Sequence, residues 1–106
     1  MKIDHLENMV RGWFVGEFEP NAFKTEVCEV GVKVYEKGDE EDAHYHKVAT
    51  EITVIISGEV EMCNKVWKAK DIITLEPGDI TNFRALSDAV CVVVKVPGAL
   101  NDKYLV

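Results

Sequence analysis

The sequence predicts a small all-β domain, and three observations point to this fold class. Short stretches of β-branched residues, or of alternating apolar and polar residues, recur along the chain. Turn-forming pairs that contain Gly, Pro, Asn, Asp or Ser separate these stretches at even intervals. No segment between residues 25 and 96 has the length and periodicity of a helix. Evenly spaced short strands are typical of a β-sandwich or a β-barrel.

The predicted strands follow one another with short connections. The first covers residues 27–36, where valine occupies every second position from 30 to 34, as in a half-buried strand. The segment 51–56 is the strongest β-former, because it is rich in Ile, Thr and Val. Asn64 and Lys65 provide a two-residue hairpin connection. The other expected strands cover residues 43–47, 59–63, 66–69, 71–75, 80–86 and 89–96.

The length of 106 residues predicts the domain organisation. A chain of this size supports one hydrophobic core, so we expect a single domain over residues 1–106. We expect residues 25–97 to form the barrel core and residues 1–24 to pack on it as an N-terminal segment. The aromatic residues of that segment are expected to serve as apolar packing. They are Trp13, Phe14, Phe18 and Phe23.

The composition disfavours several classes of function. The net charge is −7, from 12 basic and 19 acidic residues, and no basic block is present. Such a chain is repelled by nucleic acids and by anionic membrane surfaces. No apolar run is long enough to cross a bilayer, and the first residues lack the pattern of a targeting peptide. Three widely spaced cysteines indicate buried thiols in a reducing compartment. We therefore expect a cytoplasmic protein that binds neither nucleic acid nor membrane.

One group of residues carries recognisable chemistry. His44 and His46 are two residues apart, so on a strand both imidazoles point to the same face. Glu51 begins the next expected strand and can fold back beside them after a short turn. Two histidines and one carboxylate are the ligand set of many iron sites with open positions, and the set also suits Mn, Ni or Zn.

The spacing around these residues resembles a known family. The pattern Gly38-x(5)-His44-x-His46-x(4)-Glu51-x(6)-Gly58 resembles the first sequence motif of the cupin superfamily. All five fixed positions have the expected spacing. The resemblance implies a single-domain cupin with a jelly-roll β-barrel, the double-stranded β-helix, and with His44, His46 and Glu51 as metal ligands.

The second cupin motif, G-x(5)-P-x-G-x(2)-H-x(3)-N, is degraded in this chain. Aligning Gly78 with its second glycine places Thr81 where the family has histidine. A shift by one residue matches Pro77 and places Asn82 there instead. Both side chains are weak metal ligands, so a strong fourth ligand is missing. Phe83 or Arg84 follows the motif and is a candidate for the cavity mouth, where Arg84 would favour an anionic substrate.

These features lead to several functional expectations. We expect a cavity that binds a small polar molecule through a divalent transition metal, which is Mn, Fe, Co, Ni or Zn. Because a strong fourth ligand is missing, the metal is expected at partial occupancy, or the cavity is metal-free and the histidines act as hydrogen-bonding or acid–base groups. One alternative is a non-enzymatic ligand-binding or sensor protein, and another is a structural module with a vestigial site. The resemblance to cupins allows dioxygenase, isomerase, decarboxylase and non-catalytic activities, and a fold does not choose among them.

The face pattern of the strands predicts a homodimer. If Glu51 points into the barrel, then Ile52, Val54 and Ile56 point outward and are equally apolar. Strands that are apolar on both faces need cover on both faces. We therefore expect a second copy of the chain to cover the outer face.

Overall fold

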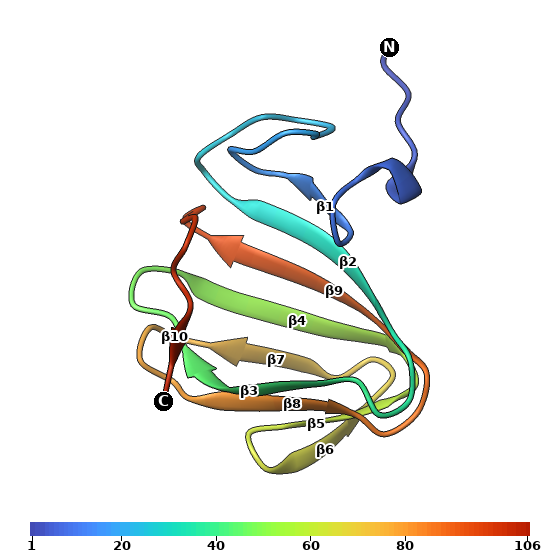
Figure 1. Ribbon diagram of the computed structural model, residues 1–106, viewed down its shortest axis with the longest axis vertical. Helices are drawn as coiled ribbons and strands as arrows, with labels where there is room; N and C mark the ends of the chain where they lie inside the picture. The colour runs from blue at the N-terminus through green and yellow to red at the C-terminus, as the bar shows by residue number, and fades with distance from the viewer.

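A computed structural model describes all 106 residues. The chain forms two five-stranded antiparallel sheets that face each other (Figure 1). The first sheet has the strand order β1 (Trp13–Val15), β2 (Glu29–Tyr35), β9 (Ala89–Val96), β4 (Thr50–Ser57) and β7 (Ile72–Leu75). The second has the order β10 (Tyr104–Leu105), β3 (Glu40–Tyr45), β8 (Thr81–Ala85), β5 (Glu59–Met62) and β6 (Lys65–Lys68).

The sheet topology confirms the predicted jelly-roll fold, with one correction. Each predicted strand is present, and the only helical segment is the short 3-10 helix Leu6–Asn8. No ladder joins the edge strands of one sheet to those of the other, so the sheets form a sandwich and not a closed barrel. The short strands β1 and β10 each form one edge of a sheet, β1 in the first sheet and β10 in the second. Both lie outside residues 25–97, which the sequence analysis assigned to the core. Each has only two or three residues, too few for a periodic signal.

The hydrophobic core lies between the two sheets. It is built from alternate residues that point inward from both sheets, and its most deeply buried side chains are Ile55, Val60 and Cys91. The prediction that Ile52, Val54 and Ile56 point outward is confirmed, because Thr53 and Ile55 are buried while their neighbours are not. No helix in the chain has the length and hydropathy needed to cross a membrane.

The outer face of the first sheet is apolar across four strands. One cross-strand row joins Val32, Val92, Val54 and Ile72. The parallel row beside it joins Val30, Val94, Ile52 and Thr74. Part of this surface stays open to solvent, since Val34 is 72% exposed and Ile72 is 63% exposed. An apolar patch of this extent on a sheet normally marks an interaction surface. The predicted homodimer stays a prediction, and we propose this face as its interface.

Substituting Val54 tests the proposed interface. Size-exclusion chromatography with light scattering at micromolar concentration should give twice the chain mass of 11.9 kDa for the wild type. Val54→Lys should give a single chain, because an ammonium group in the middle of an apolar interface loses its hydration. The matched control is Val66→Lys, since Val66 is 58% exposed on the other sheet and should leave the mass unchanged. A wild type of 11.9 kDa, or a dimer that survives Val54→Lys, would contradict the proposal.

Candidate functional site

The two histidines at the end of β3 lie side by side under one cavity. Their ring centroids are 5.5 Å apart, the ring planes make an angle of 74°, and the residues are only 5% and 6% exposed. Tyr45 lies between them in the sequence and points to the opposite face, where it stacks on Tyr104. The extended backbone therefore brings His44 and His46 together, as the two-residue period requires.

Backbone carbonyl groups fix the position of the proton on both imidazoles. Nδ1 of His44 lies 2.8 Å from the carbonyl oxygen of Asp42, and Nδ1 of His46 lies 2.9 Å from that of Asp102. A carbonyl oxygen only accepts hydrogen bonds, so each Nδ1 carries the proton and each neutral ring has its lone pair on Nε2. Nε2 of His46 is the one buried side-chain nitrogen or oxygen without a hydrogen-bond partner. Such an atom needs an explanation, and a bound ion, water or ligand supplies one.

Asp102 organises the connection that follows the histidines. Its carboxylate accepts hydrogen bonds at 3.0 Å from the backbone N–H groups of Lys47, Val48 and Ala49. Burial alone would raise the pKa of the Asp102 carboxyl, but these N–H groups stabilise the charged form and hold its pKa below the usual range. Because the carbonyl of Asp102 also holds His46, one residue fixes both the imidazole and the loop that leads into β4. Sequence analysis did not identify it, since an isolated aspartate near a chain end carries no motif.

Glu51 points into the same cavity from the start of β4. Its Oε2 lies 3.8 Å from Nε2 of His46. Burial, followed by the charge of Lys95, lowers the pKa of His46, so the imidazole is neutral at pH 7 and the contact is not an ion pair. Burial raises the pKa of Glu51, and the charge of Lys95 opposes that rise. Lys95 is the direct cross-strand neighbour of Glu51 in β9.

The two candidates for a fourth ligand have different positions. Thr81 is 3% exposed, lies opposite His44 in the β3–β8 ladder and lines a small pocket with His44 and Glu51. Its hydroxyl already donates a hydrogen bond to the carbonyl oxygen of Asn82 at 2.6 Å. The side chain of Asn82 bonds instead to Glu61 at 2.9 Å and so is engaged elsewhere. Of the two candidates, Thr81 is therefore the one that faces the pocket beside His44.

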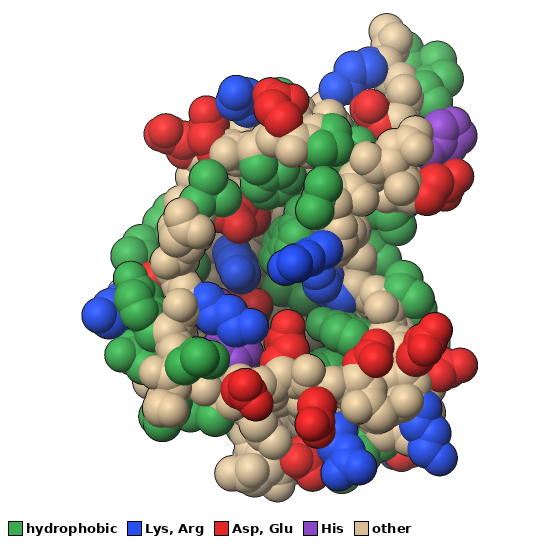
Figure 2. Space-filling view, viewed as in Figure 1, with side chains coloured by type: hydrophobic (Ala, Val, Ile, Leu, Met, Phe, Trp, Pro, Cys, Tyr) green, Lys and Arg blue, Asp and Glu red, His purple; other side chains and the backbone are tan.

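The cavity above the histidines has a volume of about 260 Å³, and cationic side chains surround its mouth. Figure 2 shows basic side chains and a histidine gathered in the hollow of this face. Its lining includes four cations, Arg11, Lys33, Lys95 and Lys103. It also includes two carboxylates, those of Glu41 and Glu51. Arg84, the sequence candidate for this role, is instead exposed on β8, while its neighbour Phe83 is buried and lines the small pocket that also contains His44, Glu51 and Thr81.

Trp13 forms one wall of the mouth. Its indole packs on Gly31, where a Cβ atom would lie 2.8 Å from the ring, so only glycine leaves room for it. The structure thus corrects the prediction that the N-terminal aromatic residues are simple apolar packing. Trp13 lines the cavity, and Phe23 is 65% exposed.

The residues at the inner end fit a divalent metal in chemistry, although their spacing is loose. No three or more His, Cys, Asp or Glu side chains converge closely enough to hold an ion. Two ligand atoms bound to one ion at about 2.1 Å lie about 3.0 to 3.4 Å apart, slightly less than the 3.8 Å between Glu51 and His46. The donor atoms themselves are suitable, because both imidazoles present Nε2 while a carbonyl holds Nδ1, the usual outer support of a metal-bound histidine.

Comparison with known proteins identifies the fold class. No family model and no curated protein sequence matches the chain. Among solved structures, a protein from Klebsiella pneumoniae, described as an uncharacterised conserved protein with a double-stranded β-helix domain, superposes with a TM-score of 0.69 and 27% identity. The match covers 76% of this chain and 71% of that one. The fold is therefore a double-stranded β-helix.

Two further solved structures share this fold. An RmlC-like cupin from Shewanella frigidimarina matches with a TM-score of 0.64 and 20% identity, over 74% of this chain and 72% of that one. The DMSP lyase DddQ from Ruegeria pomeroyi matches with a TM-score of 0.68 and 20% identity, over 88% of this chain and 49% of that one. The chain has the fold of the cupin superfamily, as the motif around His44 and His46 predicted.

The role of Asp102 can be tested through protein stability. Asp102→Asn should lower the free energy of unfolding by about 2 kcal/mol at pH 7, because an amide replaces a carboxylate that holds three backbone N–H groups. A carboxyl whose pKa is depressed in the folded state stabilises the protein above its unfolded pKa, near 4, and loses this effect as the pH falls through the lower folded value. The difference between wild type and variant in urea unfolding should therefore shrink below about pH 4.

The matched control is Asp79→Asn. Asp79 accepts a single backbone hydrogen bond, from Glu76 in an exposed turn, so its substitution should cost well under half as much. Equal losses for the two variants at pH 7, or a loss for Asp102→Asn that stays constant down to pH 3, would argue against the role given to Asp102.

Proposed function

We propose that the chain binds a small polar molecule in the cavity between its sheets, through a divalent transition metal held by His44, His46 and Glu51. The observation that carries the proposal is the fixed tautomer of the two histidines. Both rings are held at Nδ1 by carbonyl oxygens, and the buried Nε2 of His46 has no partner within the protein. A buried lone pair without a partner is costly, and coordination to an ion would satisfy it.

The surrounding residues define what the site can do chemically. A bound divalent ion would act as a Lewis acid on an oxygen atom of the ligand. Glu51 supplies a carboxylate whose charge Lys95 supports against burial. The phenol ring of Tyr35 packs against Phe83, with 4.3 Å between the ring centroids. Tyr35 also lines the cavity beside Glu51, where it can orient a polar ligand. Burial raises the pKa of Tyr35, so its hydroxyl stays protonated and acts as a hydrogen-bond donor.

A second candidate is a metal-free binding cavity without catalysis. The observation that favours it concerns Thr81, a candidate for the fourth ligand, because its hydroxyl already donates a hydrogen bond to the backbone. In this case Nε2 of His44 and His46 would accept hydrogen bonds directly from the ligand. Ligand-dependent stabilisation that is unaffected by chelators would distinguish this candidate from the first.

Metal binding is the first measurement. Elemental analysis of freshly purified, untagged protein should detect Mn, Fe, Co, Ni or Zn at up to one ion per chain. His44→Ala combined with His46→Ala should abolish it, because the remaining carboxylate is a weak single ligand. The matched control is His5→Ala, since His5 is exposed at the N-terminus and should not change the metal content.

A gain-of-function pair sharpens this test. Thr81→His should raise metal affinity, because the side chain at position 81 points to the cavity beside His44. Asn82→His should not, since the Asn82 side chain bonds to Glu61. Metal content that is unchanged in the double alanine variant would overturn the assignment of the ligands.

The pH dependence of metal stabilisation is a separate prediction. Protons compete with the ion for both imidazoles, so the metal-induced rise in melting temperature should be large at pH 8 and small at pH 5. Because the pKa of His46 is lowered on folding, the unfolded chain takes up protons first, and the metal-free protein should also lose stability below about pH 6.5. The difference between melting curves with and without added metal isolates the first effect. An equal rise at both pH values would rule out histidine ligation.

A further inference from the structure

The cations at the cavity mouth come from four separate parts of the chain. Arg11 precedes β1, Lys33 lies on β2, Lys95 lies on β9 and Lys103 precedes β10. They face two carboxylates, so the mouth is positively charged although the chain as a whole has a net charge of −7. The acidic composition does not explain a positive cavity. Of the 19 acidic residues, only Glu41 and Glu51 line it.

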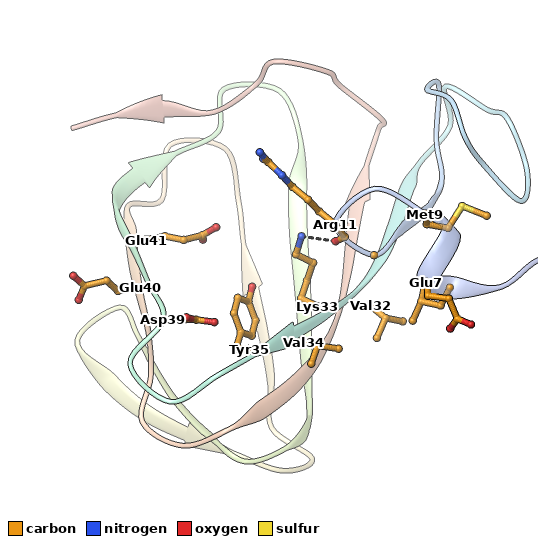
Figure 3. A pocket seen from close by; sticks show the side chains of 12 residues that line it. Glu7, Met9, Arg11, Val32, Lys33, Val34, Tyr35, Asp39, Glu40 and Glu41 are labelled. Carbon is orange, nitrogen blue, oxygen red and sulfur yellow. Dashed lines mark hydrogen bonds between the residues drawn. The ribbon is translucent and has the colours of Figure 1, made fainter.

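The backbone at Arg11 is built to reach this mouth. Arg11 and Gly12 both have positive φ angles, of 53° and 81°. A Cβ atom at Gly12 would lie only 1.8 Å from the carbonyl oxygen of Val32, so only glycine allows this approach. The turn places the carbonyl oxygen of Arg11 2.7 Å from Nζ of Lys33, and Figure 3 shows both side chains on the same side of β2 as Tyr35 and Glu41.

Two of the cations share one aromatic wall. Nζ of Lys33 lies 5.2 Å from the centroid of the Trp13 ring, and Nζ of Lys95 lies 5.1 Å from it. Both distances fall within the range of cation–π contacts. Lys33 and Lys95 point inward from mostly apolar strands, and both are half-buried. The indole thus holds two ammonium groups at the cavity entrance.

Three of the four cations lack a carboxylate partner. Lys103 pairs with Glu41 at 3.8 Å, whereas Arg11, Lys33 and Lys95 have no carboxylate within 4.0 Å. Burial lowers the pKa of Lys33, and the charges of Arg11, Lys95 and Lys103 lower it further, against the opposing effect of Glu41. The cluster is therefore electrostatically strained in the free protein, and an anion between the cations would relieve the strain.

We propose that the cavity mouth is a binding site for an oxyanion group, a carboxylate or a phosphate, of the small molecule that the cavity holds. Lys33, Lys95 and Arg11 bind the anionic group and Trp13 forms the wall beside it. The proposal rests on the cavity function proposed above and names its ligand class. A small molecule is favoured over a nucleic acid because the cations converge in a cavity of about 260 Å³.

Trp13 provides a reporter for this site. The only other tryptophan, Trp67, lies on β6 and donates a hydrogen bond to the carbonyl oxygen of Met62. Trp67→Phe leaves Trp13 as the single tryptophan fluorophore. Succinate and inorganic phosphate are the probes, each titrated against sodium chloride at equal ionic strength, with the protein as purified and after dialysis against a chelator. Isothermal titration calorimetry of the wild-type chain repeats the measurement without relying on the variant.

We expect saturable binding of at least one probe, and the responding probe distinguishes a carboxylate from a phosphate ligand. Lys95→Met and Lys33→Met should each weaken binding about tenfold or more, because each removes a charge-assisted hydrogen bond. The matched control is Lys65→Met, since Lys65 is exposed on β6 and should leave binding unchanged.

Two outcomes would overturn the inference. One is a response to both probes that is no larger than the response to chloride, and the other is binding that survives both cavity lysine substitutions. Failure here is distinct from failure of the metal proposal. Anion binding by the chelated protein together with metal content that does not depend on His44 and His46 would retain the anion site and reject the metal ligands. Histidine-dependent metal binding without anion binding would retain the metal ligands and reject the anion site.

Discussion

Asp102 holds the parts of the site together through its side-chain carboxylate and its backbone carbonyl oxygen. The loop between β3 and β4 turns too sharply for ladder hydrogen bonds, so its backbone N–H groups need another acceptor. Asp102 accepts three of them and at the same time fixes the ring of His46. Because the loop separates His46 from Glu51 by only four residues, the relative position of these two side chains depends on a segment more than 50 residues away in the sequence.

Most of the fold could be predicted because its signals are local. The valines that alternate in β2 and the β-branched run of β4 each report on burial within a single strand. That the two sheets stay open and do not close into a barrel could not be predicted, since closure depends on pairing between edge strands that lie far apart in the sequence. Glu40 and Glu41 lie before the expected strand 43–47, yet they begin β3, because pairing with β8 outweighs the low strand propensity of acidic residues.

For the candidate site too, the sequence predicts the residues that lie close together in the chain and misses those that come from distant segments. His44, His46 and Glu51 lie within eight residues, and the short connection between β3 and β4 brings them into one cavity from the two facing sheets. The cations around the mouth come from four segments that only the folded chain joins. Two of them did leave a signal. Lys95 is the only charged residue of β9, Lys33 interrupts the alternating valines of β2, and a charge on the inner face of a strand needs a reason to be there. Asp102 left none, because its role consists entirely of backbone contacts.

Lys95 links the inner and outer ends of the cavity. It lies opposite Glu51 in the sheet and beside Trp13 at the mouth. Its charge lowers the pKa of His46 and opposes the rise in the pKa of Glu51, so it favours the neutral imidazole and the ionised carboxylate that coordination requires. A divalent ion at the histidines would add to the positive potential at the mouth and strengthen the binding of an anion there. Because such coupling is reciprocal, an anion at the mouth would strengthen the binding of the ion by the same factor.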